Sequence, residues 1–418
     1  MNKLLKNREV RNKILFSLFA IAIFRFLTRV PVPGVDLEAV KSFLSGSAFF
    51  SMFDLFSGGG FQNFSIVTLG LGPYISASII VQMFSKIIPS LEELMKEGEA
   101  GREKINLYTK LLTVPLCLIQ GYSVYFLLNR QGIIEKLPAL GLTTLLFTLI
   151  GGSMILIWLG DLVTEYGVGQ GISLLIFAGI VSRLPQGVIN FLDLLNTQGL
   201  IIVSAFLVLV IVIIAGVVLV NEGTRNIPLE YGRRGVRTQK VTNTLPIKIN
   251  QAGVMPIIFA VALVQVPSIL GGPLQVASNP FLQKFGFFLS SNFSPQTLLY
   301  NLLYFLLVFG FTFFYTFSQF DPEKIADDVK KRGGFVPGIR PGRTTSKFLK
   351  DIVLKLTLVG ALFLGLIAIL PYIISSTTGI ANLTVGGTSL LIMVSVVLDT
   401  IRQVESMLVT RNYQSFLD

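Results

Sequence analysis

The chain has 418 residues, of which 52% are hydrophobic and only 14% are charged. A soluble domain of this length cannot bury so much apolar surface, so the composition excludes an ordinary soluble protein and indicates lipid as the solvent. The formal net charge of +11 would suit nucleic-acid binding, but in a membrane protein the position of each charge matters more than the sum. The sequence has no histidine and one cysteine, Cys117, so it predicts no enzyme, no intrachain disulfide, and no metal or cofactor.

Apolar runs long enough to cross a bilayer recur along the chain, since a spanning helix needs roughly 20 mostly apolar residues. The first run follows a basic N-terminus and ends at the stretch from Arg29 to Gly34, which is no small-residue cleavage site, so it is expected to be a retained helix. We predict a transmembrane helix in each of ten runs: 14–31, 65–88, 106–128, 142–160, 171–190, 199–220, 251–271, 297–317, 351–372 and 386–407.

Residues 35–64, between the first two runs, contain clustered aromatic side chains followed by three glycines. This apolar stretch is too short to span the membrane. The pattern leaves two interpretations open: an amphipathic loop at the membrane surface, or a short helix that folds back into a cavity on a glycine hinge. Irregular backbone is tolerated at membrane depth only where protein or water surrounds it.

Ten helices divide into an N-terminal half, residues 1–195, and a C-terminal half, residues 196–418. Because each half has an odd number of helices, the second half enters the membrane inverted, an arrangement common where a pathway runs between two halves. Gly70 and Pro73 in the second run of the first half correspond to Gly253 and Pro256 in the second run of the other half, and both pairs are expected to act as hinges. The predicted fold is therefore an all-α integral membrane protein with two inverted five-helix halves.

Lysine and arginine gather in the loops on one side of the predicted membrane, above all in the long loops 221–250 and 318–350. Positive residues mark the cytoplasmic side, so both termini are expected to be cytoplasmic. These loops either set the topology and are otherwise solvated, or form a docking surface for an acidic partner such as ribosomal RNA or an acidic protein face.

The interiors of the second to ninth runs contain almost no ionisable residues, which a coupled transporter normally needs near the midplane. No phosphate-binding loop of the Walker type occurs, so any nucleotide use would belong to a partner. A secondary transporter with inverted repeats and a non-conducting insertase or scaffold remain as alternatives to a channel.

Five long stretches follow one another in register at 64–82, 97–110, 158–180, 248–259 and 333–342. Together they resemble the SecY family, the channel subunits of the bacterial Sec protein translocon. The resemblance implies a channel in the bacterial inner membrane that passes unfolded preproteins and releases transmembrane segments into lipid without performing chemistry. It implies as partners the small membrane subunits SecE and SecG, the motor ATPase SecA, the translating ribosome, preprotein signal sequences and the lipid bilayer.

The resemblance also implies roles for individual positions. In SecY a ring of aliphatic side chains seals the waist of the pore, and pairs spaced i, i+4 share one helix face. An apolar constriction resists wetting and therefore resists ions. The matching positions are Leu71, Ile75, Ile176, Ile180, Ile258 and Ile392. Leu71 replaces the usual isoleucine, which is expected to be harmless because volume is conserved.

Segment 47–62 matches the SecY plug, with Phe53, Phe56, Gly58, Gly59 and Gly60, which favours the re-entrant interpretation. The second and third helices against the seventh and eighth would form a lateral gate.

Two sets of polar and basic positions follow from the same resemblance. The polar positions along the gate are Ser76, Gln82 and Asn250. The positions for docking of SecA or the ribosome are Arg225, Arg233, Arg234 and Arg340. Asn226 stands where a second arginine is common, and Glu222 and Glu230 reduce the positive charge of that loop, which weakens the expectation of ribosome docking there.

Overall fold

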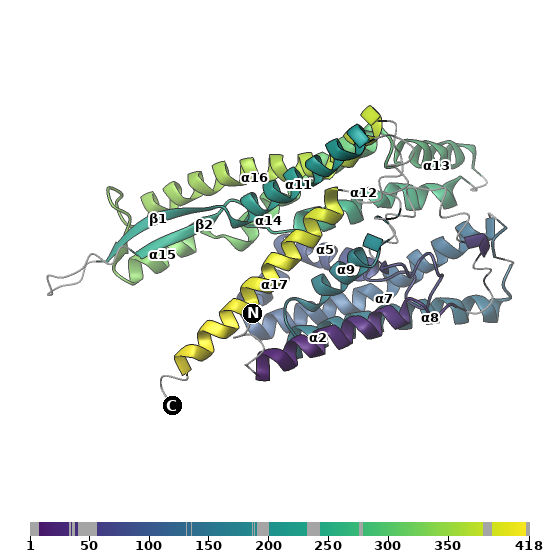
Figure 1. The fold of residues 1–418 in the computed structure, drawn as a ribbon, viewed down its shortest axis with the longest axis horizontal. Coiled ribbons are helices and arrows are strands. Elements are labelled where there is room, and N and C mark those ends of the chain that lie inside the picture. Colours follow the sequence, from purple (N-terminus) through teal and green to yellow (C-terminus); the bar gives the residue numbers. More distant parts are fainter. Residues whose placement is uncertain are drawn as a thin grey trace.

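The structure is a computed structural model in which long helices run side by side and a small sheet lies at one end (Figure 1). It describes residues 8–32, 35, 38–40, 57–130, 132–134, 136–185, 187, 189, 200–231, 243–275, 279–378 and 387–414.

A helix occurs at each of the ten predicted runs. In chain order these are α2 (Arg8–Leu27), α5 (Gly72–Ile87), α7 (Glu99–Arg130), α8 (Ala139–Tyr166), α9 (Gly171–Val181), α11 (Leu200–Glu222), α12 (Met255–Leu274), α14 (Leu298–Gln319), α16 (Arg343–Thr378) and α17 (Gly387–Gln414). Three further helices are α6 (Pro89–Lys96), α13 (Pro280–Asn292) and α15 (Pro322–Lys331).

Helix length separates these ten elements into two groups. Within the described residues, four helices are long and apolar enough to cross a membrane by themselves, in the regions of α7, α8, α14 and α16, and five if the bent pair α5 and α6 counts as one span. Others are shorter, such as α9 with 11 residues. The helices are consistent with ten spans, provided that irregular backbone completes the crossing of the short ones.

The second predicted helix begins later than expected. The sequence predicted a helix over 65–88, whereas α5 begins at Gly72, because Gly70 adopts a left-handed conformation with φ of 57° that a right-handed helix cannot contain. Helix α12 also begins later than the predicted run 251–271. It starts at Met255, because Gly253, just before it, is left-handed with φ of 64°. Pro73 and Pro256 fall in the first turn, where proline is tolerated.

The two basic segments predicted as loops contain a three-stranded antiparallel sheet, which was not expected. Its strands β1 (Thr224–Tyr231), β2 (Asn243–Lys248) and β3 (Gly334–Phe335) lie in the order β2-β1-β3. The reason is a local apolar core: Ile227 and Leu229 alternate on one face of β1 and pack with Ile247, Ala326 of α15 and Val353 of α16. The described parts of these segments therefore form a packed sheet, which we call the sheet platform.

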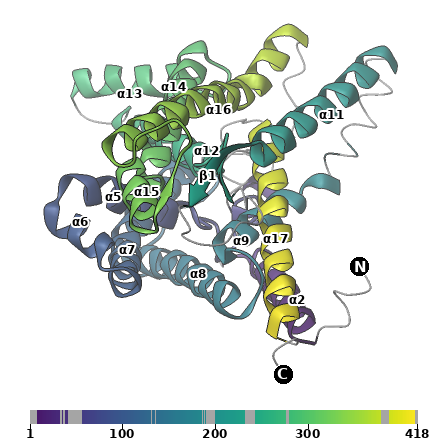
Figure 2. The same ribbon diagram turned by 90° about the vertical axis from the view of Figure 1, so that its left-hand side faces the viewer.

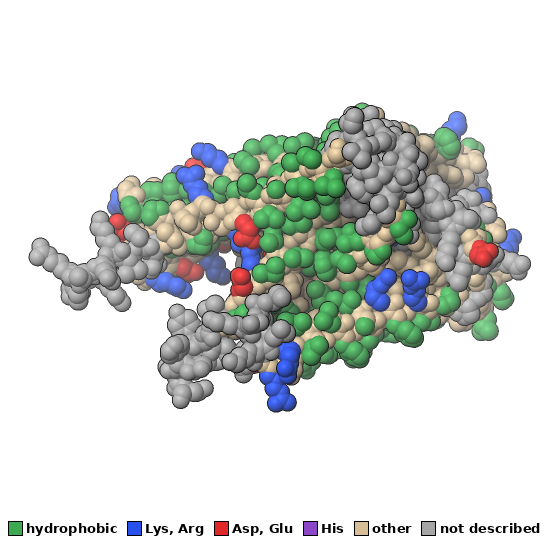
Figure 3. Space-filling view, viewed as in Figure 1, with side chains coloured by type: hydrophobic (Ala, Val, Ile, Leu, Met, Phe, Trp, Pro, Cys, Tyr) green, Lys and Arg blue, Asp and Glu red, His purple; other side chains and the backbone are tan. Residues whose placement is uncertain are grey.

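Helices of the two predicted halves lie on opposite sides of the molecule, except α17 of the second half, which contacts α9 and α2 of the first (Figure 2). Viewed from the end that carries the sheet, α2, α7 and α8 occupy one side and α13, α14 and α16 the other (Figure 2). The halves touch where α12 meets α5 and α7, and where α17 meets α9 and α2. On the face shown in Figure 3, hydrophobic side chains cover most of the middle, and charged side chains gather toward the sheet end.

Candidate functional site

The six aliphatic positions singled out in the sequence all lie in the interior. None is more than 5% exposed, and all six belong to one apolar cluster that includes residues from both halves. They come from α5 and the residue before it, from α9, from α12 and from α17, which are the helices along which the halves touch. The fold thus buries in one apolar cluster six side chains that the sequence spreads over more than 300 residues.

A polar contact closes the seam between α5 and α14. The hydroxyl of Tyr315 donates a hydrogen bond of 2.5 Å to Oε1 of Gln82, whose Nε2 donates to the hydroxyl of Ser78 at 2.8 Å. The ring of Phe259 on α12 packs against Tyr315 at a centroid distance of 5.0 Å. Ser76 is half-buried on α5. The contact is made by α14, so it joins the two halves.

Asn250 hydrogen-bonds elsewhere. Its Nδ2 donates to Oδ1 of Asn221 on α11 at 2.8 Å, and Nδ2 of Asn221 donates to the hydroxyl of Ser395 on α17 at 2.6 Å. Asn250 therefore ties the start of α12 to α11 and α17, in addition to donating to the carbonyl of Gly253 at 3.1 Å. By sequence, Asn250 groups with Ser76 and Gln82 along the gate. The hydrogen-bond partners of Asn250 that the structure describes, however, belong to the second half.

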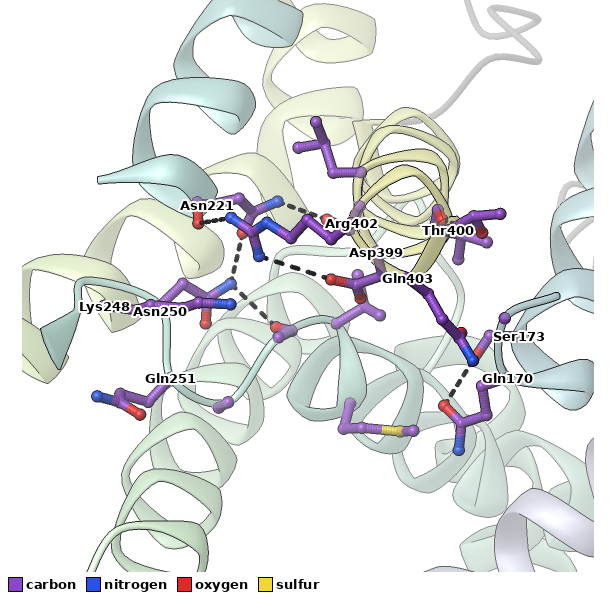
Figure 4. Close-up of a pocket in the computed structure, with 18 of the residues that line it drawn as sticks. Gln170, Ser173, Asn221, Lys248, Asn250, Gln251, Asp399, Thr400, Arg402 and Gln403 are labelled. Atoms are coloured by element: carbon purple, nitrogen blue, oxygen red, sulfur yellow. Dashed lines mark hydrogen bonds and ion pairs between the residues drawn. The ribbon is translucent and has the colours of Figure 1, made fainter. Parts of the chain in front are cut away.

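The bonded asparagines line a cavity of about 320 Å³ (Figure 4). Arg402 of α17 points toward Asn221 there, donates to its backbone carbonyl at 3.1 Å, and forms an ion pair of 2.7 Å with Glu222. Sequence reasoning missed Asn221 and Ser395. Within α17, Arg402 also contacts Asp399, at the longer distance of 3.8 Å. The available signal was the group of ionisable residues Asp399, Arg402 and Glu405 that follows the apolar first part of this helix.

The three glycines at 58–60 form a tight turn. Gly58 and Gly59 have φ of 63° and 90°, a region that only glycine enters readily. A Cβ on Gly60 would lie 2.9 Å from both the hydroxyl of Ser65 and the carbonyl oxygen of Val67, so this turn is closely packed. Phe53 and Phe56 lie outside the described residues.

Of the basic positions, Arg225 on β1 and Arg340 after β3 are exposed, whereas Arg233 and Arg234 lie outside the described residues. Around Arg340 the other lysines and arginines are exposed as well: Lys324, Lys330, Lys331, Arg332, Arg343, Lys347 and Lys350. Across the parts of the chain that the structure describes, no three His, Cys, Asp or Glu side chains lie close enough together to hold a metal ion.

Comparison with known proteins decides the family. A model of the SecY family matches residues 65–401. The chain belongs to the SecY family. It is 42% identical to the protein translocase subunit SecY of Thermus thermophilus, over 98% of this chain and 95% of that protein. It is 40% identical to the SecY of Aquifex aeolicus, over 100% and 99% of the two chains.

Solved structures share the SecY fold. A structure described as that of a protein conducting channel has a TM-score of 0.67 and 21% identity, over 96% of this chain and 93% of the other. Sec61 in a canine ribosome-channel complex has a TM-score of 0.66 and 22% identity, with the same coverage. The predicted SecY membership and all-α membrane fold are thus confirmed.

Proposed function

We propose that this SecY-family chain is the pore subunit of a protein translocase in the bacterial inner membrane. It passes unfolded preproteins through its centre and releases transmembrane segments sideways into lipid. One observation carries the proposal: the six aliphatic side chains come from helices of both halves and share one buried cluster.

Aliphatic side chains at such a junction form a seal because an ion would have to leave its water shell to pass them. Aliphatic side chains can also move apart around a passing polypeptide, because they form no hydrogen bonds with one another or with it. This SecY channel performs no chemistry in the proposal, and the driving force comes from SecA or from translation.

The seam between α5, α7, α12 and α14 is the proposed lateral gate. Its contact between Gln82 and Tyr315 is a polar bond between membrane helices, worth only about 0.6–2 kcal/mol. A signal sequence that enters between α5 and α14 can replace so weak a bond with its own apolar packing.

The sheet platform is the proposed docking surface for SecA and the ribosome, with Arg225 and Arg340 exposed on it. Ribosome docking is supported by two proteins of similar structure: canine Sec61 in a ribosome-channel complex, and a yeast Ssh1 complex bound to the 80S ribosome. In Figure 1, α2 begins and α17 ends toward the sheet end, which supports a topology with both termini in the cytoplasm. SecE and SecG are the proposed small membrane subunits, as the family implies.

The decisive test places charge in the seal. Ile75→Arg and Ile180→Arg are each reconstituted with the partner subunits, and ion leakage and signal-sequence selectivity are measured. We expect leakage to rise and selectivity to fall, while Ile75→Val and Ile180→Val, which nearly conserve shape, stay sealed. If both properties are unchanged in both arginine variants, the seal is elsewhere.

Two alternatives have their own measurements. A secondary transporter would show flux of a small solute into vesicles. A scaffold would give no continuous path when a stalled preprotein is crosslinked to positions from Ile75 to Ile392.

A further inference from the structure

Arg25 is a charged residue near the end of the apolar helix α2, and its side chain is directed at the glycine turn. Its Nη1 donates a hydrogen bond of 2.7 Å to the carbonyl of Gly58, 33 residues further along the chain. A guanidinium within a membrane helix is costly and is retained mainly for function. A bond from a charged donor is also roughly twice as strong as a neutral one.

A second side chain joins the same two elements. Nδ2 of Asn63 donates to the carbonyl of Thr28 at the end of α2 and to the carbonyl of Gly59, both at 3.1 Å. The hydroxyl of Thr28 donates to the carbonyl of Arg25 at 2.8 Å and so fixes the end of this helix. The carbonyls of Gly58 and Gly59 therefore both accept hydrogen bonds from side chains. One donor, Arg25, lies on α2, and the other, Asn63, also bonds to the residue just after α2.

The turn that they hold lies against the wall of the proposed pore. A Cβ on Gly58 would lie 2.5 Å from Cζ of Phe24 on α2 and 3.1 Å from the Cα of Gly179 on α9. Gly179 directly precedes Ile180, one of the six aliphatic positions. Gly58 is therefore wedged between two helices next to the proposed seal, and only a residue without a side chain fits there.

We propose that Arg25 and Asn63 form a latch that holds the glycine turn, residues 57–60, in place beside α9 while the channel is closed. Opening then requires the bond from Arg25 to Gly58 to break. This inference rests on the proposed channel function, and it gives Arg25 a positioning role that acts through the turn. One solved neighbour is described as showing that the plug domain of SecY stabilises the closed state and maintains a membrane seal.

The test replaces the latch residues and leaves the aliphatic positions intact. Arg25→Met keeps a long side chain but removes the hydrogen-bond donor to Gly58. Asn63→Ala removes the hydrogen bonds to Thr28 and Gly59. In the complete complex, reconstituted in proteoliposomes, we expect ion leakage of the idle channel to rise about tenfold for Arg25→Met, the order expected for one charge-assisted bond. Preprotein translocation should persist, and Arg25→Lys should restore part of the seal.

Arg29→Met is the matched control, because Arg29 lies one turn further along and is exposed. It should leak no more than the unmodified channel. If Arg25→Met fails to assemble, Asn63→Ala carries the test, with a smaller rise in leakage. The latch is overturned if both variants assemble and stay sealed. That result is distinct from failure of the channel proposal, in which the unmodified complex would pass no preprotein and Ile75→Arg would not leak.

Discussion

The hydroxyl of Tyr315 on α14 lies 2.5 Å from Oε1 of Gln82 on α5, although 233 residues separate them in the chain. The bond joins the second half to the first, beside the packed rings of Tyr315 and Phe259. It is the kind of contact that a gate requires: specific enough to define a closed position, and weak enough to be exchanged.

Removing this bond should make the gate easier to open. We expect Tyr315→Phe to favour the open state by about 3- to 30-fold, the equivalent of about 0.6–2 kcal/mol. Translocation of a preprotein with a weakened signal sequence measures the effect. Tyr304→Phe on the same helix is the control, because the buried hydroxyl of Tyr304 has no hydrogen-bond partner among the described residues. Equal behaviour of the two variants would contradict a gate at Gln82.

The buried asparagine bridge should contribute more to stability than the neighbouring ion pair. Asn221→Leu removes the side-chain amide that bonds Ser395 and one of the two acceptors of Asn250, and should cost about 1–3 kcal/mol. Glu222→Gln weakens a bond to Arg402 at a partly exposed position and should cost less than about 1 kcal/mol. Thermal unfolding of both variants in detergent gives the comparison; a larger effect at Glu222 would refute this ranking.

Two adjacent glycines on α8 should respond oppositely to the same substitution. A Cβ on Gly152 would lie 1.9 Å from the carbonyl oxygen of Ile66, whereas one on Gly151 would meet no described atom within 4 Å outside the backbone of its own helix. Gly152→Ala should therefore destabilise the protein by about 1–3 kcal/mol or more. Gly151→Ala should be neutral or stabilising by up to about 1 kcal/mol, because alanine favours a helix. The midpoints of thermal unfolding of the two variants are compared. Similar midpoints would show that α8 does not pack closely on residue 66.

Charge reversal on the sheet platform should weaken partner binding. We expect Arg340→Glu to lower the affinity for SecA or the ribosome by about three- to tenfold at low salt, and by less at high salt. Binding to the reconstituted channel is measured at several ionic strengths. Lys284→Glu on α13, exposed on the predicted opposite side, should leave the affinity unchanged. If the two reversals act alike, the platform is not the docking surface.

The apolar runs could be read from the sequence because hydrophobicity is a property of each segment alone, and helices were found at all ten. The first residues of α5 and α12 could not be predicted from the sequence. The length of an apolar run does not say whether Gly70 and Gly253 adopt a left-handed conformation. The sheet was missed for a similar reason: β1 and β2 are short, and their pairing depends on packing against α15 and α16.

The sequence by itself determined the solvent of this protein, the number of apolar segments, and the residue types available for a seal, because composition and spacing carry that information. Only the tertiary structure decided which side chains meet. It joined Gln82 to Tyr315, Asn250 to Asn221, and Arg25 to Gly58. Such partners lie tens to hundreds of residues apart, and their distance is set by how helices pack rather than by any local pattern.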